Sequence, residues 1–113
     1  MGLFKKVSRK NMVTLQKFKP VFTTVDGHKR IGCEYHYGIV ERLRCSVPEY
    51  IMIDIKNDGY LEDNYGVMYP LTNIVSIDWQ LVDEKKVEDK FGEYQTFVTT
   101  KDIEQRVFWM YLF

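Results

Sequence analysis

The sequence contains no alanine, although alanine is the best helix former and one of the commonest residues in proteins. It is rich instead in residues that suit a pleated, half-buried surface: twelve valines, eight isoleucines, seven threonines, eight tyrosines and seven phenylalanines. Hydrophobic residues make up 45% of the chain, which excludes the apolar-poor composition of a disordered protein. Composition therefore predicts a folded domain that is mostly β.

Other features are also missing. No apolar run approaches the roughly 18 residues of a membrane span, and the start of the chain lacks the apolar stretch of a secretory signal. Two cysteines are too few for a disulfide framework, so we expect free thiols and a cytoplasmic location. The 113 residues fit one domain. We expect a basic arm or short helix over residues 1–11 and a single β-rich domain over residues 12–113.

The chain also has no net charge, because 16 basic side chains balance 16 acidic ones. The balance hides a division along the chain. Residues 1–31 carry eight basic side chains and one acid, a net charge of +7, whereas residues 32–113 carry eight basic and fifteen acidic side chains, a net charge of −7. Opposite charges of this kind either screen each other within the fold or attract a charged partner.

Turn residues divide the chain into short extended runs. Asp26-Gly27 predicts a hairpin over about 21–34 with a two-residue turn. Further strands are expected over 12–18, 50–56, 74–82 and 94–99, and a bent strand over 33–43. In the run 50–56, Ile51, Ile53 and Ile55 alternate with Tyr50, Met52 and Asp54, which predicts a strand with a core on one side. Residues 83–93 hold eight charged side chains, which indicates a solvated loop or short helix.

The end of the chain allows several structures. Thr100 followed by early acids indicates a helix start. Residues 107–113 are seven consecutive apolar side chains, typical of a core helix, a buried strand or a docking surface. The predicted fold class is thus α+β, mostly β: a single small domain with a strongly bent antiparallel sheet, or an SH3-like or Sm-like partial barrel. A short N-terminal helix and a C-terminal helix or strand complete it.

Patterns for catalysis or metal binding are weak. His28, Cys33, His36 and Cys45 fall close together, but their outer spacings match no common structural zinc pattern. Neither cysteine is accompanied by a nucleophile signature, and the glycines are isolated, without a phosphate-binding loop. We expect no catalytic residues, no metal site, no cofactor and no enzyme activity.

Nucleic-acid binding is the second functional class that the sequence permits. It needs basic side chains to neutralise phosphates and aromatic rings to stack on bases. Tyr35, Tyr37, Phe18 and Phe22 could supply rings on neighbouring strands. The candidate basic residues are Lys5, Lys6, Arg9, Lys10, Lys17, Lys19, Lys29 and Arg30.

Protein binding is the class that we prefer. Residues 32–113, with their excess of acids, offer the charged rim typical of a protein interface. The aromatic residues at the C-terminus offer its anchor side chains. The candidate partner-binding residues are Asp83, Glu84, Glu88, Asp89, Glu93, Arg106, Trp109 and Tyr111. Such an acidic field could block the basic groove of a nucleic-acid enzyme. By analogy with small inhibitors from phages and mobile elements, the target could be an RNA-guided nuclease.

Overall fold

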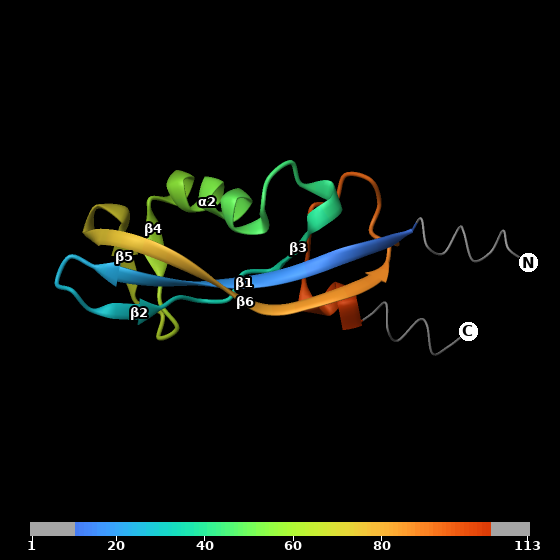
Figure 1. Ribbon diagram of the computed structural model, residues 1–113. Coiled ribbons are helices and arrows are strands. Elements are labelled where there is room, and N and C mark those ends of the chain that lie inside the picture. Colours follow the sequence, from blue (N-terminus) through green and yellow to red (C-terminus); the bar gives the residue numbers. More distant parts are fainter. Residues whose placement is uncertain (1–10, 105–113) are drawn as a thin grey trace, which may run out of the picture.

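Two long antiparallel strands, β1 (Met12–Thr24) and β6 (Ile74–Glu88), run side by side through the computed structural model, which describes residues 11–104 (Figure 1). The other strands are β2 (Lys29–Ile31), β3 (Tyr37–Ile39), β4 (Tyr60–Glu62), β5 (Met68–Pro70) and β7 (Phe97–Val98). The helix α2 (Val47–Asp58) and two 3-10 turns, η1 (Val40–Arg42) and η2 (Leu71–Asn73), connect them. The α+β, mostly β prediction is confirmed.

Strand β1 is the centre of a bent five-stranded sheet. Strand β6 pairs with one side of β1 along nearly its whole length, while β2 and β3 pair with the other side and β7 pairs with β3. Strands β4 and β5 form a separate two-stranded sheet. Strands β6 and β7 lie at opposite edges, so the sheet is open within the described residues.

The sheet is buried on both faces, in different halves. Strand β1 buries the odd-numbered Val13 and Leu15 near its start and the even-numbered Pro20 and Phe22 near its end, where Val21 between them is also buried. Successive residues of a strand point to opposite faces, so these two groups belong to cores on opposite sides of the sheet. In β6, Val82 is an extra residue between the pairs Lys17–Asp83 and Phe18–Leu81, and this bulge marks the change of face.

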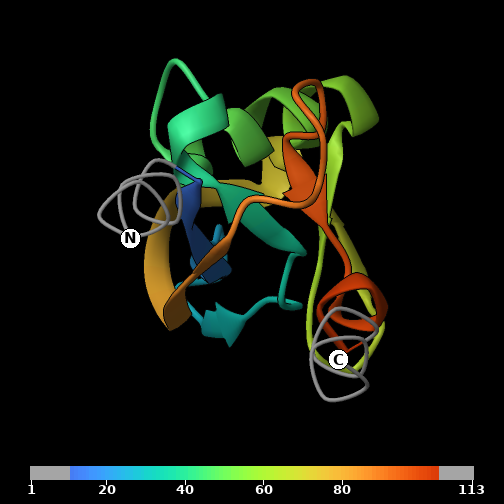
Figure 2. The same cartoon turned by 90° about the vertical axis from the view of Figure 1, so that its right-hand side faces the viewer.

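One core lies between the sheet and α2. It contains Phe22, Leu61 and the three helix residues Val47, Ile51 and Ile55. The other core joins the start of β1 to β3 and to the C-terminal described segment, with Val13, Leu15, Tyr37, Ile39, Phe91, Val98 and Ile103. Figure 2 shows α2 on one side of the sheet and residues 100–104 on the other.

The prediction of a strand over 50–56 is wrong, because these residues belong to α2. Ser46 caps the helix by accepting a hydrogen bond from the Glu49 amide at 3.2 Å, and Gly59 ends it in the left-handed conformation with φ of 82°. Val47, Ile51 and Ile55 are four residues apart and share the buried face, whereas Ile53 is 53% exposed. The alternating isoleucines resemble a strand, but the buried residues repeat every four positions, as in a helix.

The predicted hairpin over 21–34 is confirmed, but its turn is longer than expected. Strands β1 and β2 pair from Val21–Ile31 to Thr23–Lys29, and the Thr24 amide donates to the His28 carbonyl at 3.0 Å. A two-residue turn of the expected type needs positive φ at two residues. Within residues 11–104 positive φ occurs at glycines, here at Gly27. The turn therefore has three residues.

Two other predicted segments differ in extent. Strand β6 continues through residues 83–88, so the loop or short helix predicted for 83–93 is wrong over that stretch. The bent strand predicted for 33–43 reduces to β3, followed by η1. Gly38 accounts for the close packing there, because a Cβ atom at this position would lie 2.8 Å from a Val47 methyl group.

The predicted strand over 94–99 also shortens, to β7. The helix expected from Thr100 is present over residues 100–104, but its capping residue is Thr99, whose hydroxyl accepts from the Asp102 amide at 3.2 Å. The possible N-terminal helix over 1–11 falls almost entirely outside the described residues. The apolar segment 107–113 also lies outside them.

Candidate protein-binding edge

The outer edge of β6 is the longest open strand edge among residues 11–104. Strand β6 is 15 residues long and, within residues 11–104, pairs with β1 alone. A strand at a sheet edge presents unpaired amide and carbonyl groups, which can pair with an added strand. The residues of β6 whose backbone groups face outward supply the donors and acceptors of this edge.

The contacts of β1 identify them. The Phe18 carbonyl accepts from the Tyr35 amide at 3.0 Å and the Pro20 carbonyl accepts from the Gly32 amide at 2.7 Å, on the side of β1 away from β6. Even-numbered residues of β1 thus direct their backbone groups away from β6. Odd-numbered residues must face β6, because these directions alternate along an antiparallel strand.

The register then fixes the orientation of β6. Val13 pairs with Val87, Leu15 with Lys85 and Lys17 with Asp83. These β6 residues direct their amide and carbonyl groups toward β1, so the residues between them direct theirs outward. We call the stretch Asp83–Glu88 the charged edge. Its outward-facing backbone belongs to Glu84, Lys86 and Glu88, and the side chains of these three residues are exposed.

Three of the predicted partner-binding acids lie on the charged edge, with different surroundings. Glu84 accepts a hydrogen bond from the side-chain amide of Gln16 at 2.6 Å, and the Glu88 carboxylate lies 3.6 Å from the Lys90 ammonium group. Asp83 faces the other side of the sheet, where it accepts from the Tyr37 hydroxyl and lies 3.6 Å from Lys85. The Tyr37 hydrogen bond holds the pKa of Asp83 below its usual range.

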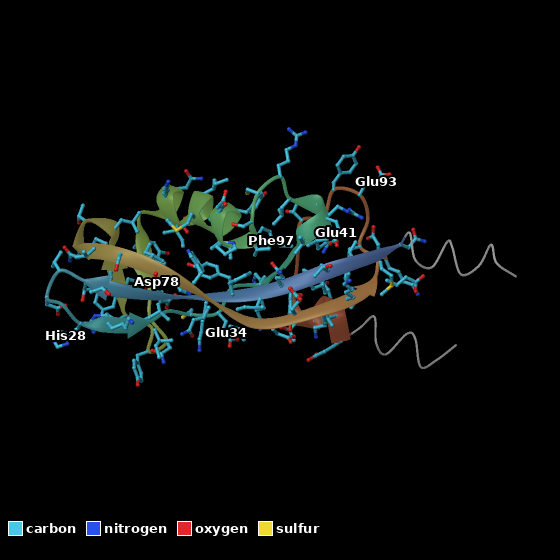
Figure 3. The ribbon with its side chains drawn as sticks, viewed as in Figure 1. His28, Glu34, Glu41, Asp78, Glu93 and Phe97 are labelled. Carbon is cyan, nitrogen blue, oxygen red and sulfur yellow. The ribbon has the colours of Figure 1, made fainter. Side chains whose placement is uncertain are left out.

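The remaining predicted acids follow the strand. Asp89 forms an ion pair with Arg42, and both side chains are mostly buried, so this carboxylate is engaged within the fold. Glu93 is exposed in the loop after β6, at the end of the molecule opposite His28 (Figure 3). Arg106, Trp109 and Tyr111 lie outside the described residues.

Sequence reasoning missed Lys86, which lies between Glu84 and Glu88 on the same face of β6. The three charges alternate in sign at a spacing of two residues. This spacing would have identified the row if residues 83–88 had been recognised as a strand.

Tyr37 is the centre of a small polar cluster on the opposite face. The ammonium groups of Lys17 and Lys85 lie 5.3 and 4.9 Å from its ring centre, and its hydroxyl donates to Asp83. Burial, reinforced by the Asp83 hydrogen bond, raises the pKa of Tyr37 to about 12. Burial also raises the pKa of Tyr35 to about 12.

These two tyrosines predict a loss of stability in alkaline solution. Between about pH 10 and pH 12 the unfolded chain releases their protons while the folded protein keeps them, so the free energy of unfolding falls as pH rises. The buried Tyr37 accounts for about 2 kcal/mol of this fall. Urea titrations across this range should give a shallower decline for Tyr37→Phe than for the wild type. An equal decline would contradict the assignment.

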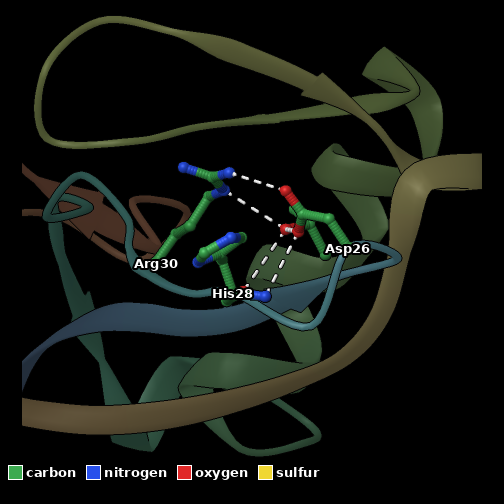
Figure 4. Close-up of polar contacts among 4 residues, drawn as sticks. Asp26, His28 and Arg30 are labelled. Carbon is green, nitrogen blue, oxygen red and sulfur yellow. Dashed lines mark hydrogen bonds and ion pairs between the residues drawn. The ribbon is translucent and has the colours of Figure 1, made fainter.

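Within residues 11–104, two of the candidate basic side chains already have acidic partners. Lys17 lies 3.4 Å from Glu34, and Arg30 lies 3.2 Å from Asp26 in the hairpin turn (Figure 4), with its guanidinium 4.7 Å from the Tyr69 ring centre. Lys19 lines a surface hollow of about 370 Å³, and Lys29 lines an adjoining one of about 200 Å³. Lys5, Lys6, Arg9 and Lys10 lie outside the described residues. Residues 11–104 hold eleven basic and sixteen acidic side chains, and the other nineteen residues hold five basic side chains and no acid, so the whole chain is neutral.

Within the cysteine and histidine cluster, the Cys33 thiol is engaged in the fold. The Cys33 thiol donates to the Asp63 carbonyl at 2.9 Å, and burial together with Glu62 and Asp63 raises its pKa, which opposes thiolate formation. Among residues 11–104, no three His, Cys, Asp or Glu side chains gather as metal ligands. In that part of the chain we also find no helix with the length and apolar character needed to cross a membrane.

Comparison of the chain with protein-family models, with curated protein sequences and with solved structures found no match.

Proposed function

We propose that this protein is a non-enzymatic protein-binding module that takes an extended segment of its partner onto the outer edge of β6. The open 15-residue edge is the observation that carries the proposal. Main-chain hydrogen bonds would supply affinity, as in other complexes formed by strand addition. Residues 32–113, which include the charged edge, carry a net charge of −7 within a chain that is neutral overall, and this acidic part favours a basic partner.

Nucleic-acid enzymes are the partner class that fits this charge, because their grooves are basic where they hold phosphates. Strand addition at the charged edge would place Glu84, Glu88 and the adjacent acids against such a groove. The proposed consequence is inhibition, since a protein seated there excludes the nucleic acid. This mode of action requires no cofactor and no catalytic residue.

A proline at position 86 tests the edge without disturbing the pairing of β6 with β1. The Lys86 amide faces away from β1, so Lys86→Pro removes a donor available to an added strand and no hydrogen bond of the β1–β6 ladder. Lys86→Ala removes the same side chain but keeps the amide, and it is the matched control. We expect Lys86→Pro to weaken partner capture about tenfold or more relative to Lys86→Ala.

The measurement is a pull-down from a lysate of the source cells with wild type, Lys86→Ala and Lys86→Pro, after circular dichroism has established equal folding. A protein retained by the first two and lost by the third supports the proposal. Equal retention by all three would mean that the charges and the bulge merely protect the edge from aggregation. Salt-sensitive binding of generic nucleic acid, abolished by charge reversal at Lys5, Lys6, Arg9 and Lys10, would favour the nucleic-acid alternative.

A further inference from the structure

The charged edge carries an alternating row of side chains on one face of the sheet. Glu84, Lys86 and Glu88 are all exposed, and their charges read negative, positive, negative along the strand. Their backbone groups also face outward, so a strand added to this edge would place residues directly opposite all three. Side chains directly opposite each other on neighbouring strands come within about 5 Å and interact.

We infer that the segment which adds to β6 carries Lys or Arg, then Asp or Glu, then Lys or Arg at alternate positions. This inference rests on the proposed strand addition and specifies the chemistry of the partner segment. The complement of a negative, positive, negative row is positive, negative, positive. Because this pattern is the same in both directions, it applies to parallel and antiparallel addition alike.

The opposite face of the charged edge contributes little to this selection. There the Asp83 carboxylate accepts from Tyr37, and the Lys85 ammonium group lies against the Tyr37 ring. Val87 on the same face is packed against the core around Leu15. The intervening residues of an added strand would therefore meet charges that already have partners, and the selective charge pairs belong to the row of Glu84, Lys86 and Glu88.

The groups in this row retain capacity for a partner. One Glu84 oxygen accepts from Gln16, which leaves the second oxygen for an incoming ammonium or guanidinium group. Within residues 11–104, Lys86 has no carboxylate within 4 Å, and its charge acts on the more distant carboxylate of Glu41. Glu88 meets Lys90 through one oxygen at 3.6 Å and keeps its second oxygen for a partner. Individual cross-strand charge pairs are modest, but three favourable pairs replaced by three like-charge contacts should change affinity by about tenfold or more.

Synthetic peptides test the pattern directly. The probes are nine-residue peptides of Thr and Ser with blocked ends, whose positions 3, 5 and 7 read Lys-Glu-Lys, Glu-Lys-Glu or Thr-Thr-Thr. Each is titrated by NMR into wild type, into Lys86→Pro, and into the charge-inverted triple variant Glu84→Lys, Lys86→Glu, Glu88→Lys. We expect the wild type to bind Lys-Glu-Lys about tenfold more tightly than Glu-Lys-Glu, the triple variant to reverse this order, and Lys86→Pro to weaken both.

The outcomes separate the inference from the function on which it rests. If all three peptides bind the wild type equally and lose affinity for Lys86→Pro, strand addition stands and the charge pattern is overturned. An unchanged order in the triple variant overturns the pattern as well. Failure of every peptide to bind also overturns it, because the pattern is then insufficient, while partner capture by Lys86→Ala and Lys86→Pro still decides the proposed function.

Discussion

Phe22→Ala is expected to lower the free energy of unfolding by about 3–5 kcal/mol. The Phe22 side chain is fully buried in the core beneath α2, together with Ile51, Ile55 and Leu61. Its ring also meets the Tyr69 ring edge-on at a centroid distance of 5.5 Å. Truncation at this position removes contacts with the helix and with the small β4–β5 sheet together, and the surroundings are too constrained to collapse into the cavity.

Urea denaturation measures this loss, with two variants for comparison. Val75→Ala truncates a residue that is 68% exposed and should change the free energy of unfolding by less than about 0.5 kcal/mol. Phe22→Leu keeps most of the buried volume and should cost about 1–2 kcal/mol, which keeps the test measurable if the alanine variant does not fold. A loss below about 1 kcal/mol for Phe22→Ala would contradict the described core.

The parts of the fold that depend on local backbone preferences were predictable from the sequence. Asp26-Gly27 marked the β1–β2 hairpin because glycine readily adopts the left-handed conformation that the turn requires, although the number of turn residues was not determined by the pair itself. The absence of alanine correctly indicated a mostly β fold. Both inferences depend on backbone preferences of the residues themselves.

The helix α2 shows where such reasoning fails. Residues 51, 53 and 55 alternate as in a strand, but Val47, Ile51 and Ile55 also repeat every fourth residue. Ser46, Pro48 near the helix start, and Gly59 at its end favour the helix. Caps and tertiary packing outweighed the β propensity of isoleucine, which is a weak and context-dependent preference.

The candidate site was only partly predictable, for a related reason. Residues 83–93 contain eight charged side chains, and their local sequence resembles a solvated loop. In the structure, its first part is held in β6 by pairing with β1, whose residues lie some 70 positions earlier in the chain. Glu84 and Glu88 were identified by charge, but Lys86 and the open edge itself depend on this long-range register.

Amide hydrogen exchange at the charged edge tests the central claim most directly. In the free protein, the outward amides of Glu84, Lys86 and Glu88 should exchange rapidly, whereas those of Asp83, Lys85 and Val87 should be protected because they face β1. A bound partner strand should slow the three outward amides by about tenfold to a hundredfold and leave the other three nearly unchanged. If the outward amides exchange equally fast in the free protein and in the complex, the partner does not add to β6 and the account is wrong.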